Sequence, residues 1–338
     1  MVPMSELNRM RREGIEKLTN TRLETYLQLK ESNRADTEHA KKSDFIGSNE
    51  LPPQLVVQVS SMEQAQAALA GDADGIYFTG DFLSDLEVAE KIRKLAENKG
   101  KQFILGLPRI IPEELKKSIW EKLTLNAAQK ADAWAVSHIG NLEFIRNAYP
   151  EKKVWGDFSL NIFTNEALQE YLDNGVTEAV LSPELTLEQI KNITNKQGAG
   201  AQLTVHGYQE LMVSKFCPLG SYLGGLGDGN LCSQPCLAGE YHLRDRKGEA
   251  LPIQTDEFCQ MHLFNGQELS TLPYIPELLD LGVATWRIDG RLIKPTKLKE
   301  LVKIYKKEIE DKNAIRGRAE ELLLSGKVTR GHYYRGVE

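Results

Sequence analysis

The only four cysteines of this chain lie close together in the sequence. Cys217, Cys232, Cys236 and Cys259 follow the spacing C-x14-C-x3-C-x22-C. Four thiolates gathered in this way can fill one tetrahedral site for a soft metal, hold an iron–sulfur cluster, or form two disulfides. The paired C-x2-C motifs of many zinc sites are absent, whereas iron–sulfur clusters accept irregular spacing. The spacing therefore favours a [4Fe-4S] cluster, with zinc and free or disulfide-bonded cysteines as the alternatives.

A second group of polar residues lies at or just after the ends of predicted strands. Its members are Arg109, His138, Asp157, Asn161, His206, Arg287, Asp289 and Arg291. In a parallel barrel, functional side chains lie at the C-terminal ends of the strands. Arg287, Asp289 and Arg291 alternate along one strand and therefore share a face. Any one of them could belong to an ordinary salt bridge, but their common location predicts a pocket.

Several catalytic motifs are absent from the sequence. There is no His-Glu-x-x-His, no Gly-x-Ser-x-Gly, no P-loop, and no Gly-x-Gly-x-x-Gly after the first predicted strand. The glycine-rich stretch near Gly225 follows no predicted strand, so we interpret it as a flexible loop. Neither a motif-defined hydrolase nor a dinucleotide-binding protein is supported.

The elements that must position these residues alternate regularly from Gln54 onward. Apolar stretches of strand length are followed by stretches with helical periodicity. The predicted strands are Gln54–Ser60, Gly75–Gly80, Gln102–Arg109, Ala133–His138, Val154–Leu160, Glu178–Pro183, Ala201–Gly207 and Ala284–Arg291. Eight such units predict an α/β fold, a closed (β/α)8 TIM-like barrel. The cysteine-rich segment 217–259 is then an insertion between strands 7 and 8, over the barrel mouth.

Both ends of the chain differ from this pattern. Ser5 to Lys30 carry apolar residues at roughly helical spacing, and Glu31 to Asn49 are almost entirely polar. We predict a helix and a mobile linker over residues 1–50, and a separate domain over residues 51–338. Residues 294–335 are rich in Lys and Arg. They predict a basic C-terminal helix and tail, either a solvated helix face or a local basic surface.

The composition restricts the class of protein. Hydrophobic residues make up 41% and charged residues 27% of the 338 residues, which is typical of a globular chain. Neither a long apolar run nor a secretory leader is visible, so we expect no membrane contact and a cytoplasmic location, where disulfides are disfavoured. The net charge of −6 provides no global attraction to nucleic acid.

Three segments within residues 201–291 resemble the U32 peptidase family. They are VHGYQELMVSKFCPLG, NLCSQPCLAGEYHLRDRKGEALPI, and a stretch that ends in WRIDGR. The shared pattern is a His-Gly after a strand, a cysteine before proline, a Cys-x3-Cys, a Leu-x-Asp-Arg and a final Arg-Ile-Asp-Gly-Arg. The opening helix and the tail TRGHYYRGV resemble parts of longer, two-barrel members. The chain thus resembles the C-terminal part of such a protein, with the upstream barrel as its partner.

The resemblance implies a function and a cofactor. Some members are named collagenase-like proteases, while others are prephenate-dependent RNA base hydroxylases or assist ubiquinone hydroxylation. The hydroxylating members bind [4Fe-4S] clusters through four cysteines, which correspond here to Cys217, Cys232, Cys236 and Cys259. We therefore expect an iron–sulfur-dependent oxygen-insertion enzyme or subunit that acts on an RNA base. The alternatives are a collagenase-like peptidase and a non-catalytic barrel module of a longer protein.

Roles follow for the polar residues. His206 is the candidate proton donor or acceptor, and Asp289 and Arg291 complete the catalytic candidates. The substrate-binding candidates are Arg109, Asp157, Asn161 and Arg287, and the forks of Arg287 and Arg291 suit a carboxylate or phosphate. We expect a positively charged pocket bounded by His206, Arg291, Asn161 and the cysteine segment, suited to an anionic ligand such as prephenate or an RNA phosphate. The opposing interpretation is that Asp289 pairs with an arginine in a salt-bridge girdle.

Overall fold

The computed structural model describes residues 3–37, 52–81, 86–197, 200–310 and 328–334. It contains two compact units, Met1–Ile46 and Gly47–Glu338. In the first unit, a single helix α1 (Met4–Thr37) extends beyond the expected end at Lys30, since residues 31–37 include neither Pro nor Gly to stop it. The remainder of the predicted linker, residues 38–49, lies outside the described residues.

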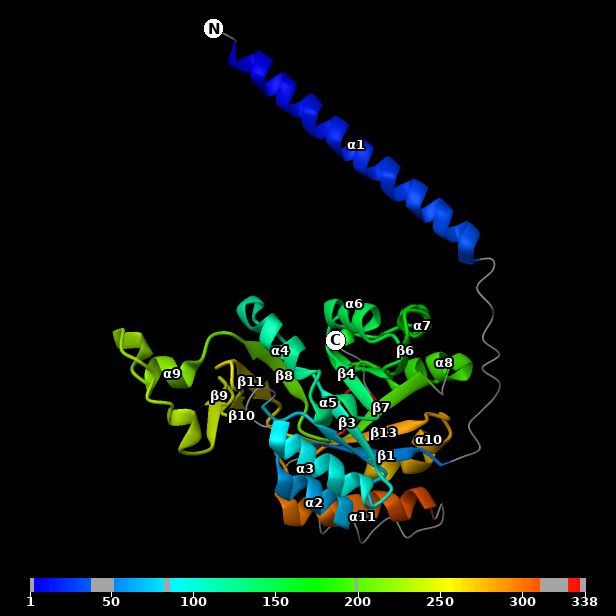
Figure 1. Ribbon diagram of the computed structural model, residues 1–338, viewed down its shortest axis with the longest axis vertical. Coiled ribbons are helices and arrows are strands. Elements are labelled where there is room, and N and C mark those ends of the chain that lie inside the picture. Colours follow the sequence, from blue (N-terminus) through cyan, green and yellow to red (C-terminus); the bar gives the residue numbers. More distant parts are fainter. Residues whose placement is uncertain (1–2, 38–51, 82–85, 198–199, 311–327, 335–338) are drawn as a thin grey trace. The chain divides into compact units, whose positions relative to one another are not determined.

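The second unit is built around a closed parallel barrel (Figure 1). The strand order is β13-β1-β2-β3-β4-β5-β6-β7, and pairing of β13 with β7 closes the ring. The strands are β1 Gln54–Val59, β2 Gly75–Phe78, β3 Gln102–Gly106, β4 Ala133–Val136, β5 Val154–Gly156, β6 Val176–Val180, β7 Ala201–Gly207 and β13 Thr285–Asp289. The predicted (β/α)8 fold is therefore confirmed.

Helices follow most strands and cover the outside of the barrel. They are α2 Met62–Ala70, α3 Leu86–Glu97, α4 Lys116–Lys122, α5 Asn126–Gln129, α6 Ile139–Ala148, α7 Asn165–Asp173, α8 Leu187–Gln197, α10 Ile275–Leu279 and α11 Pro295–Glu310, with short 3-10 turns η1 Glu113–Leu115, η2 Phe158–Leu160 and η6 Leu272–Tyr274. Local sequence fixes several starts: the Ser61 hydroxyl accepts from the backbone N–H of Gln64, and the Thr164 hydroxyl from that of Ala167.

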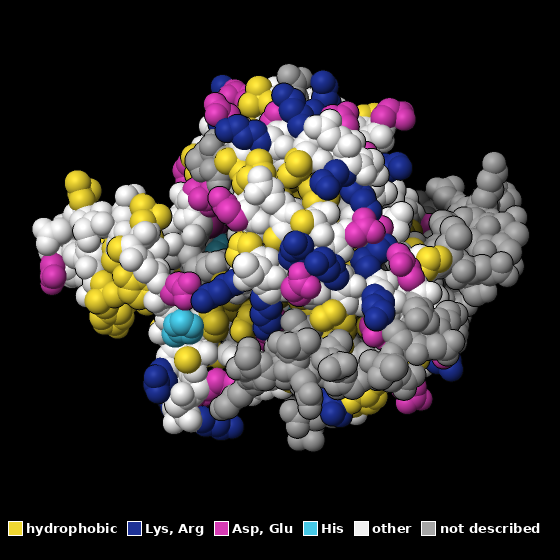
Figure 2. All heavy atoms as spheres, turned by 90° about the horizontal axis from the view of Figure 1, so that it is seen from below, with side chains coloured by type: hydrophobic (Ala, Val, Ile, Leu, Met, Phe, Trp, Pro, Cys, Tyr) yellow, Lys and Arg dark blue, Asp and Glu magenta, His cyan; other side chains and the backbone are white. Residues whose placement is uncertain are grey.

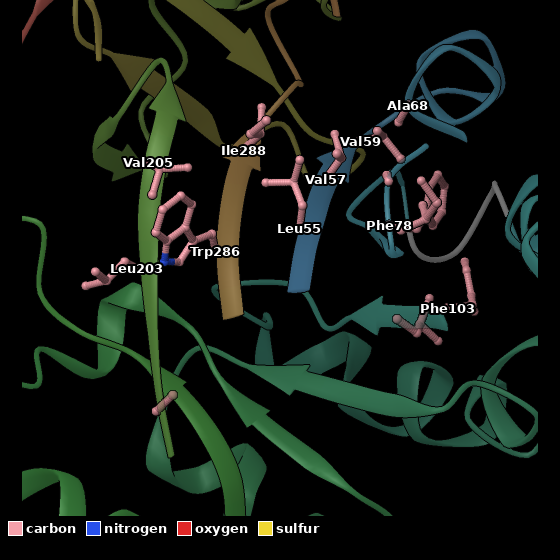
Figure 3. Close-up of a cluster of buried hydrophobic side chains, with 14 of the residues drawn as sticks. Leu55, Val57, Val59, Ala68, Phe78, Phe103, Leu203, Val205, Trp286 and Ile288 are labelled. Carbon is pink, nitrogen blue, oxygen red and sulfur yellow. The ribbon is translucent and has the colours of Figure 1, made fainter. Parts of the chain in front are cut away.

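Alternation along the strands separates two sets of side chains. Outward-facing residues such as Leu55, Val57 and Trp286 are fully buried against the helices and form the main core (Figure 3). The residues between them, such as Val56 and Tyr77, form a small second cluster. Because successive side chains on a strand point to opposite faces, this second set lies inside the barrel, and the polar candidates on the same strands continue it toward the mouth.

The insertion between β7 and β13 is a small domain in its own right. It holds an antiparallel sheet of order β8-β11-β10-β9, made of β8 Glu210–Ser214, β9 Tyr241–Arg244, β10 Ala250–Thr255 and β11 Met261–Phe264. Helix α9 (Pro218–Tyr222) and turns η4 (Leu226–Asp228) and η5 (Pro235–Leu237) lie between β8 and β9. Beyond the sheet, β12 (Glu268–Ser270) pairs with β7 and with β14 (Val328–Thr329). The sequence did not predict these six strands.

The basic C-terminal helix is present as α11, although residues 311–327 lie outside the described part. Within α11, Lys297 pairs with Glu268, Lys303 with Glu300, and Lys306 with Asp74. Three of its cations are thus compensated by carboxylates. For α11, the solvated and paired helix face is the better interpretation.

Candidate functional site

Arg291 is held in one orientation at the mouth of the barrel. Its Nε and Nη2 donate to the two carboxylate oxygens of Asp289 at 3.0 and 2.7 Å, and its Nη1 donates to Glu210 at 2.8 Å. The guanidinium also stacks over the ring of Phe264. Asp289 therefore does pair with an arginine, as the salt-bridge interpretation required. The donors of Arg291 are largely committed to these two carboxylates.

Glu210 is the centre of this charge network, and it was not among the predicted site residues. Its buried carboxylate accepts from Arg291 and Arg109 and lies 3.4 Å from Nδ1 of His262. Burial alone would raise the pKa of Glu210, but the charges of Arg291, His262 and Arg109 hold it well below its usual range. Glu210 is thus a permanent anion that ties β8 and β11 to the barrel rim.

His262 is the second residue that sequence reasoning missed. It lies on β11, a strand that was not predicted, and its Nε2 is 3.3 Å from the carboxylate of Asp256. Burial lowers the pKa of His262, yet the hydrogen bond to Asp256 and the negative charges of Asp256 and Glu210 outweigh it and raise that pKa to about 9. The imidazole is therefore a cation at neutral pH.

Arg287 and Asp157 form a second pair deeper in the barrel. Nη1 of Arg287 donates to Asp157 at 2.9 Å, the Tyr77 hydroxyl donates to the same carboxylate at 2.8 Å, and the guanidinium lies 4.1 Å from the centroid of the Tyr77 ring. Arg287 is 3% exposed, but its Nη2 is buried and has no hydrogen-bond partner. An unmet charged donor is costly, so this atom marks a place where an acceptor is expected.

Three neighbouring hollows lie between this point and the inserted domain. An inner chamber of about 30 Å³ includes Arg287, Asp157, Thr204, Tyr208 and Asp289 in its wall. An outer chamber of about 90 Å³ shares Asp157 with it and adds Arg109, His262 and Arg291. A wide groove of about 690 Å³ shares His262 and Arg291 with the outer chamber and extends to Cys236 and Lys294. Neighbouring hollows share wall residues, so together they extend from the barrel interior to the cysteine-rich insertion.

The structure does not assemble the pocket that the sequence predicted. His206 is 1% exposed; its Nδ1 lies 3.1 Å from the Tyr305 hydroxyl and its Nε2 lies 3.0 Å from Glu268. A register shift pairs Thr204 with Arg287 but His206 with Ile288, so the bulge turns the imidazole toward α11 and away from the chambers. Burial, offset in part by Glu268, lowers the pKa of His206.

Asn161 does not take part either. It ends η2 with a left-handed backbone (φ 52°), is exposed, and lines none of the three hollows. His138 caps α6, where its ring accepts from the backbone N–H of Asn141. Of the predicted site residues, the structure brings together Arg109, Asp157, Arg287, Asp289 and Arg291.

The expected positive charge is also absent. The cations around the chambers are Arg109, His262, Arg287 and Arg291, and the anions are Asp81, Asp157, Glu210, Asp256, Glu257 and Asp289. The acids outnumber the cations, whereas the sequence argument counted two arginines against one aspartate and left out the other acids at the mouth. The mouth is therefore an ionic network with an excess of carboxylates and does not attract anions.

The cysteines lie in turns of the inserted domain. Cys217 caps the start of α9, and its sulfur accepts from the backbone N–H of Gly220 at 3.3 Å. The sulfur of Cys232 accepts from the backbone N–H of Gln234 at 3.4 Å. Cys259 lies in the turn between β10 and β11 with φ 58°. Such N–H donors stabilise thiolates and are typical around ligating sulfurs.

The sulfurs of Cys217 and Cys232 lie close to each other. A Cβ built on Gly220 would lie 3.4 Å from the sulfur of Cys232 and 3.6 Å from that of Cys217, so these two sulfurs are at most about 7 Å apart. Burial raises the pKa of Cys259, and the charges of Cys217, Cys236 and Cys232 raise it further. The donor set fits an iron–sulfur cluster.

A single metal ion fits less well. A tetrahedral zinc with bonds of about 2.3 Å would draw its sulfurs to within about 3.8 Å of one another. Among the residues described here, no three His, Cys, Asp or Glu side chains are placed to bind one ion.

The inserted domain also exposes large apolar side chains (Figure 2). They are Leu211, Met212, Phe216, Tyr222, Leu223, Leu226, Leu231 and Leu237. Residues 211–237 contain only two charged side chains, Lys215 and Asp228. The surface near the thiols is therefore markedly less polar than that of the barrel.

Fold and site together define a (β/α)8-barrel protein with a thiol-rich domain inserted at the barrel mouth. The chain belongs to peptidase family U32, whose sequence model matches residues 60–330. No described helix combines the length and apolar character that crossing a membrane requires.

The family includes relatives with different names. The chain is 26% identical over 284 residues to a collagenase of Porphyromonas gingivalis, covering 76% of this chain and 65% of that protein. It is 24% identical over 250 residues to tRNA hydroxylation protein P2 of Bacillus subtilis, covering 73% and 79%. It is 23% identical over 254 residues to the 23S rRNA 5-hydroxycytidine C2501 synthase of Escherichia coli, covering 73% and 37%. The chain thus spans about two thirds or less of several relatives.

A solved structure titled the U32 peptidase Mk0906 aligns with 50% of this chain and 74% of its own, at 14% identity and a TM-score of 0.39.

Proposed function

We propose that this protein takes part in iron–sulfur-dependent hydroxylation of an RNA base. The observation that carries the proposal is the single wide groove whose wall includes both the barrel mouth and Cys236. The wide groove has Arg291 and His262 near one end and Cys236 in its wall. A redox group held by the four cysteines would therefore border the same hollow that receives the substrate.

Cys217, Cys232, Cys236 and Cys259 would hold the cluster. When bound, a [4Fe-4S] cluster supplies one-electron transfer. The chain's own residues provide the rest of the site. The network of Arg109, Glu210 and Arg291 fixes the rim, and the Arg287–Asp157 pair fixes the floor of the inner chamber. The names of the relatives from Bacillus subtilis and Escherichia coli, which refer to RNA hydroxylation, support the choice of substrate.

The second candidate is a peptidase, because one relative is named a collagenase. A covalent peptidase needs a nucleophile that hydrogen bonds to a base. Within the described parts of the chain, no histidine ring is hydrogen-bonded to a Ser, Thr or Cys side chain, and the sulfurs of Cys217 and Cys232 accept from backbone N–H groups. The geometry favours the first proposal. The upstream barrel and prephenate remain predictions from the resemblance.

The test uses the organism that encodes this chain. The gene is deleted and replaced by the unaltered gene, by Cys232→Ser, or by the control Ser233→Ala, and nucleosides of total RNA are quantified by mass spectrometry. We expect one nucleoside, heavier than its parent by one oxygen atom, to disappear in the deletion and in Cys232→Ser but to return with the other two genes. An unchanged nucleoside profile in the deletion strain would rule out RNA hydroxylation.

A further inference from the structure

The inner chamber contains a buried charged donor without an acceptor. The Nη2 of Arg287 has no partner among the described residues, although Nη1 of the same group is bound to Asp157. Two further groups in the chamber wall, the hydroxyls of Thr204 and Tyr208, also have no side-chain hydrogen-bond partner in the described part. The chamber therefore offers several uncommitted polar groups around one cation.

The charges in the wall select against an anionic ligand. Asp157, Asp289 and Glu210 all line this chamber, and each is already paired with an arginine. A carboxylate brought to Nη2 of Arg287 would meet these three anions, while a neutral carbonyl or ring nitrogen would gain the same hydrogen bond without that repulsion. The favoured ligand is an uncharged acceptor.

Two aromatic rings also lie in the wall, and one face of the Phe158 ring is covered by the guanidinium of Arg109. Phe158 lines both chambers, and Tyr208 lines both the inner chamber and the wide groove. Bases of single-stranded nucleic acid bind by stacking on such rings and by hydrogen bonds to their polar edges. The groove outside also contains Lys294, an exposed cation with no carboxylate partner among the described residues, which can contact a phosphate.

We propose that the inner chamber receives the neutral acceptor edge of one base from a single-stranded RNA that lies in the wide groove, and that Arg287 recognises this edge. The inference rests on the proposed function and names its recognition residue. A peptide is the opposing occupant, because β9 is an edge strand of the inserted sheet and Tyr241 and His242 of that strand line the groove.

The test is binding of a fluorescein-labelled hexauridylate and of its fully abasic analogue to the full chain, measured by fluorescence anisotropy. Wild-type protein is expected to bind the uridylate on the order of tenfold more tightly than the abasic strand, the size of one charge-assisted hydrogen bond. Arg287→Lys keeps the charge opposite Asp157 but loses the second arm of the fork. The variant should bind hexauridylate no more tightly than the abasic strand, while its affinity for the abasic strand should equal that of wild type.

A matched control is Arg93→Lys on α3, because Arg93 is also a buried arginine paired with two carboxylates but lies outside the three hollows. It should retain the preference for uridylate. If Arg287→Lys fails to fold, Thr204→Val and Tyr208→Phe, which remove one hydroxyl each, should reduce the preference. The assignment would be overturned if wild type and all chamber variants showed the same preference for uridylate. It would also be overturned if the protein bound a gelatin peptide more tightly than hexauridylate and if that peptide binding depended on Arg287.

Two experimental outcomes distinguish an error in the chamber assignment from an error in the proposed hydroxylation. If Cys232→Ser abolishes the hydroxylated nucleoside in cells while Arg287→Lys leaves it at wild-type level, hydroxylation stands and the chamber assignment is refuted. If hexauridylate binding depends on Arg287 but the deletion leaves every nucleoside unchanged, the chamber stands and hydroxylation is refuted.

Discussion

Replacement of Gly224 by alanine should impair the cysteine site specifically. A Cβ at this position would lie 2.7 Å from the sulfur of Cys232 and 2.9 Å from both the Cα and the carbonyl oxygen of Gly220. Favourable contacts between heavy atoms lie at about 3.5–4.0 Å, so the sulfur or the backbone must move by about 1 Å. Overpacking of this size costs about 1–3 kcal/mol. The cost falls on a ligand of the proposed cluster.

The control for this variant is Gly239→Ala in the same inserted domain. The nearest atom to a Cβ at Gly239 is a Tyr241 ring carbon at 3.9 Å, an ordinary contact. Both proteins are purified without oxygen and supplied with iron and sulfide, and iron per chain and visible absorbance are measured. Gly224→Ala should retain well under half of the iron bound by Gly239→Ala. Equal iron content in the two variants would refute the argument that Cys232 is a ligand packed against Gly224.

Three further predictions concern the ionic networks. Asp157→Asn leaves the buried guanidinium of Arg287 without its counter-ion. It should lower the free energy of unfolding, measured by urea denaturation, by about 3–5 kcal/mol. A loss below about 1 kcal/mol would contradict a stabilising ion pair between Arg287 and Asp157. The pKa of His262 is raised to about 9 from 6.5, so its ion pairs contribute fully below about pH 6.5 and are lost as the pH rises through 9. The free energy of unfolding of wild type should fall by up to about 3 kcal/mol between pH 6.5 and 9.5, and that of His262→Gln should fall clearly less. If unfolding free energy changes with pH in the same way in both proteins, His262 does not have this role. His206→Gln should lower the melting temperature but leave hexauridylate affinity per folded molecule unchanged, and a selective loss of affinity would return His206 to the site.

The barrel could be predicted because its signals are local. Each strand is a short apolar stretch followed by a helix with its own periodicity, and parallel βα units admit few topologies. The eight predicted strands therefore correspond to β1–β7 and β13. Arg109, Asp157, Arg287, Asp289 and Arg291 could be placed at the mouth for the same reason, because each follows from its position on a strand.

The remainder depended on contacts that are distant in sequence. Strands β8–β11 pair with one another across turns and a helix, so no local pattern shows which stretches meet. Glu210 follows β7 closely and could have been considered as a rim residue, but its partner His262 could not. A bulge in β7 determines the direction of the His206 side chain. The alternation of polar and apolar residues along a strand does not reveal such a bulge.

The central claim is that four cysteines hold an iron–sulfur cluster beside the substrate path. Its most direct test is the content of iron, acid-labile sulfide and zinc in the full chain purified without oxygen. We predict about four irons and four sulfides per chain, falling to near zero in Cys232→Ser. One zinc per chain without sulfide, or the same iron and sulfide content in Cys232→Ser, would contradict the account.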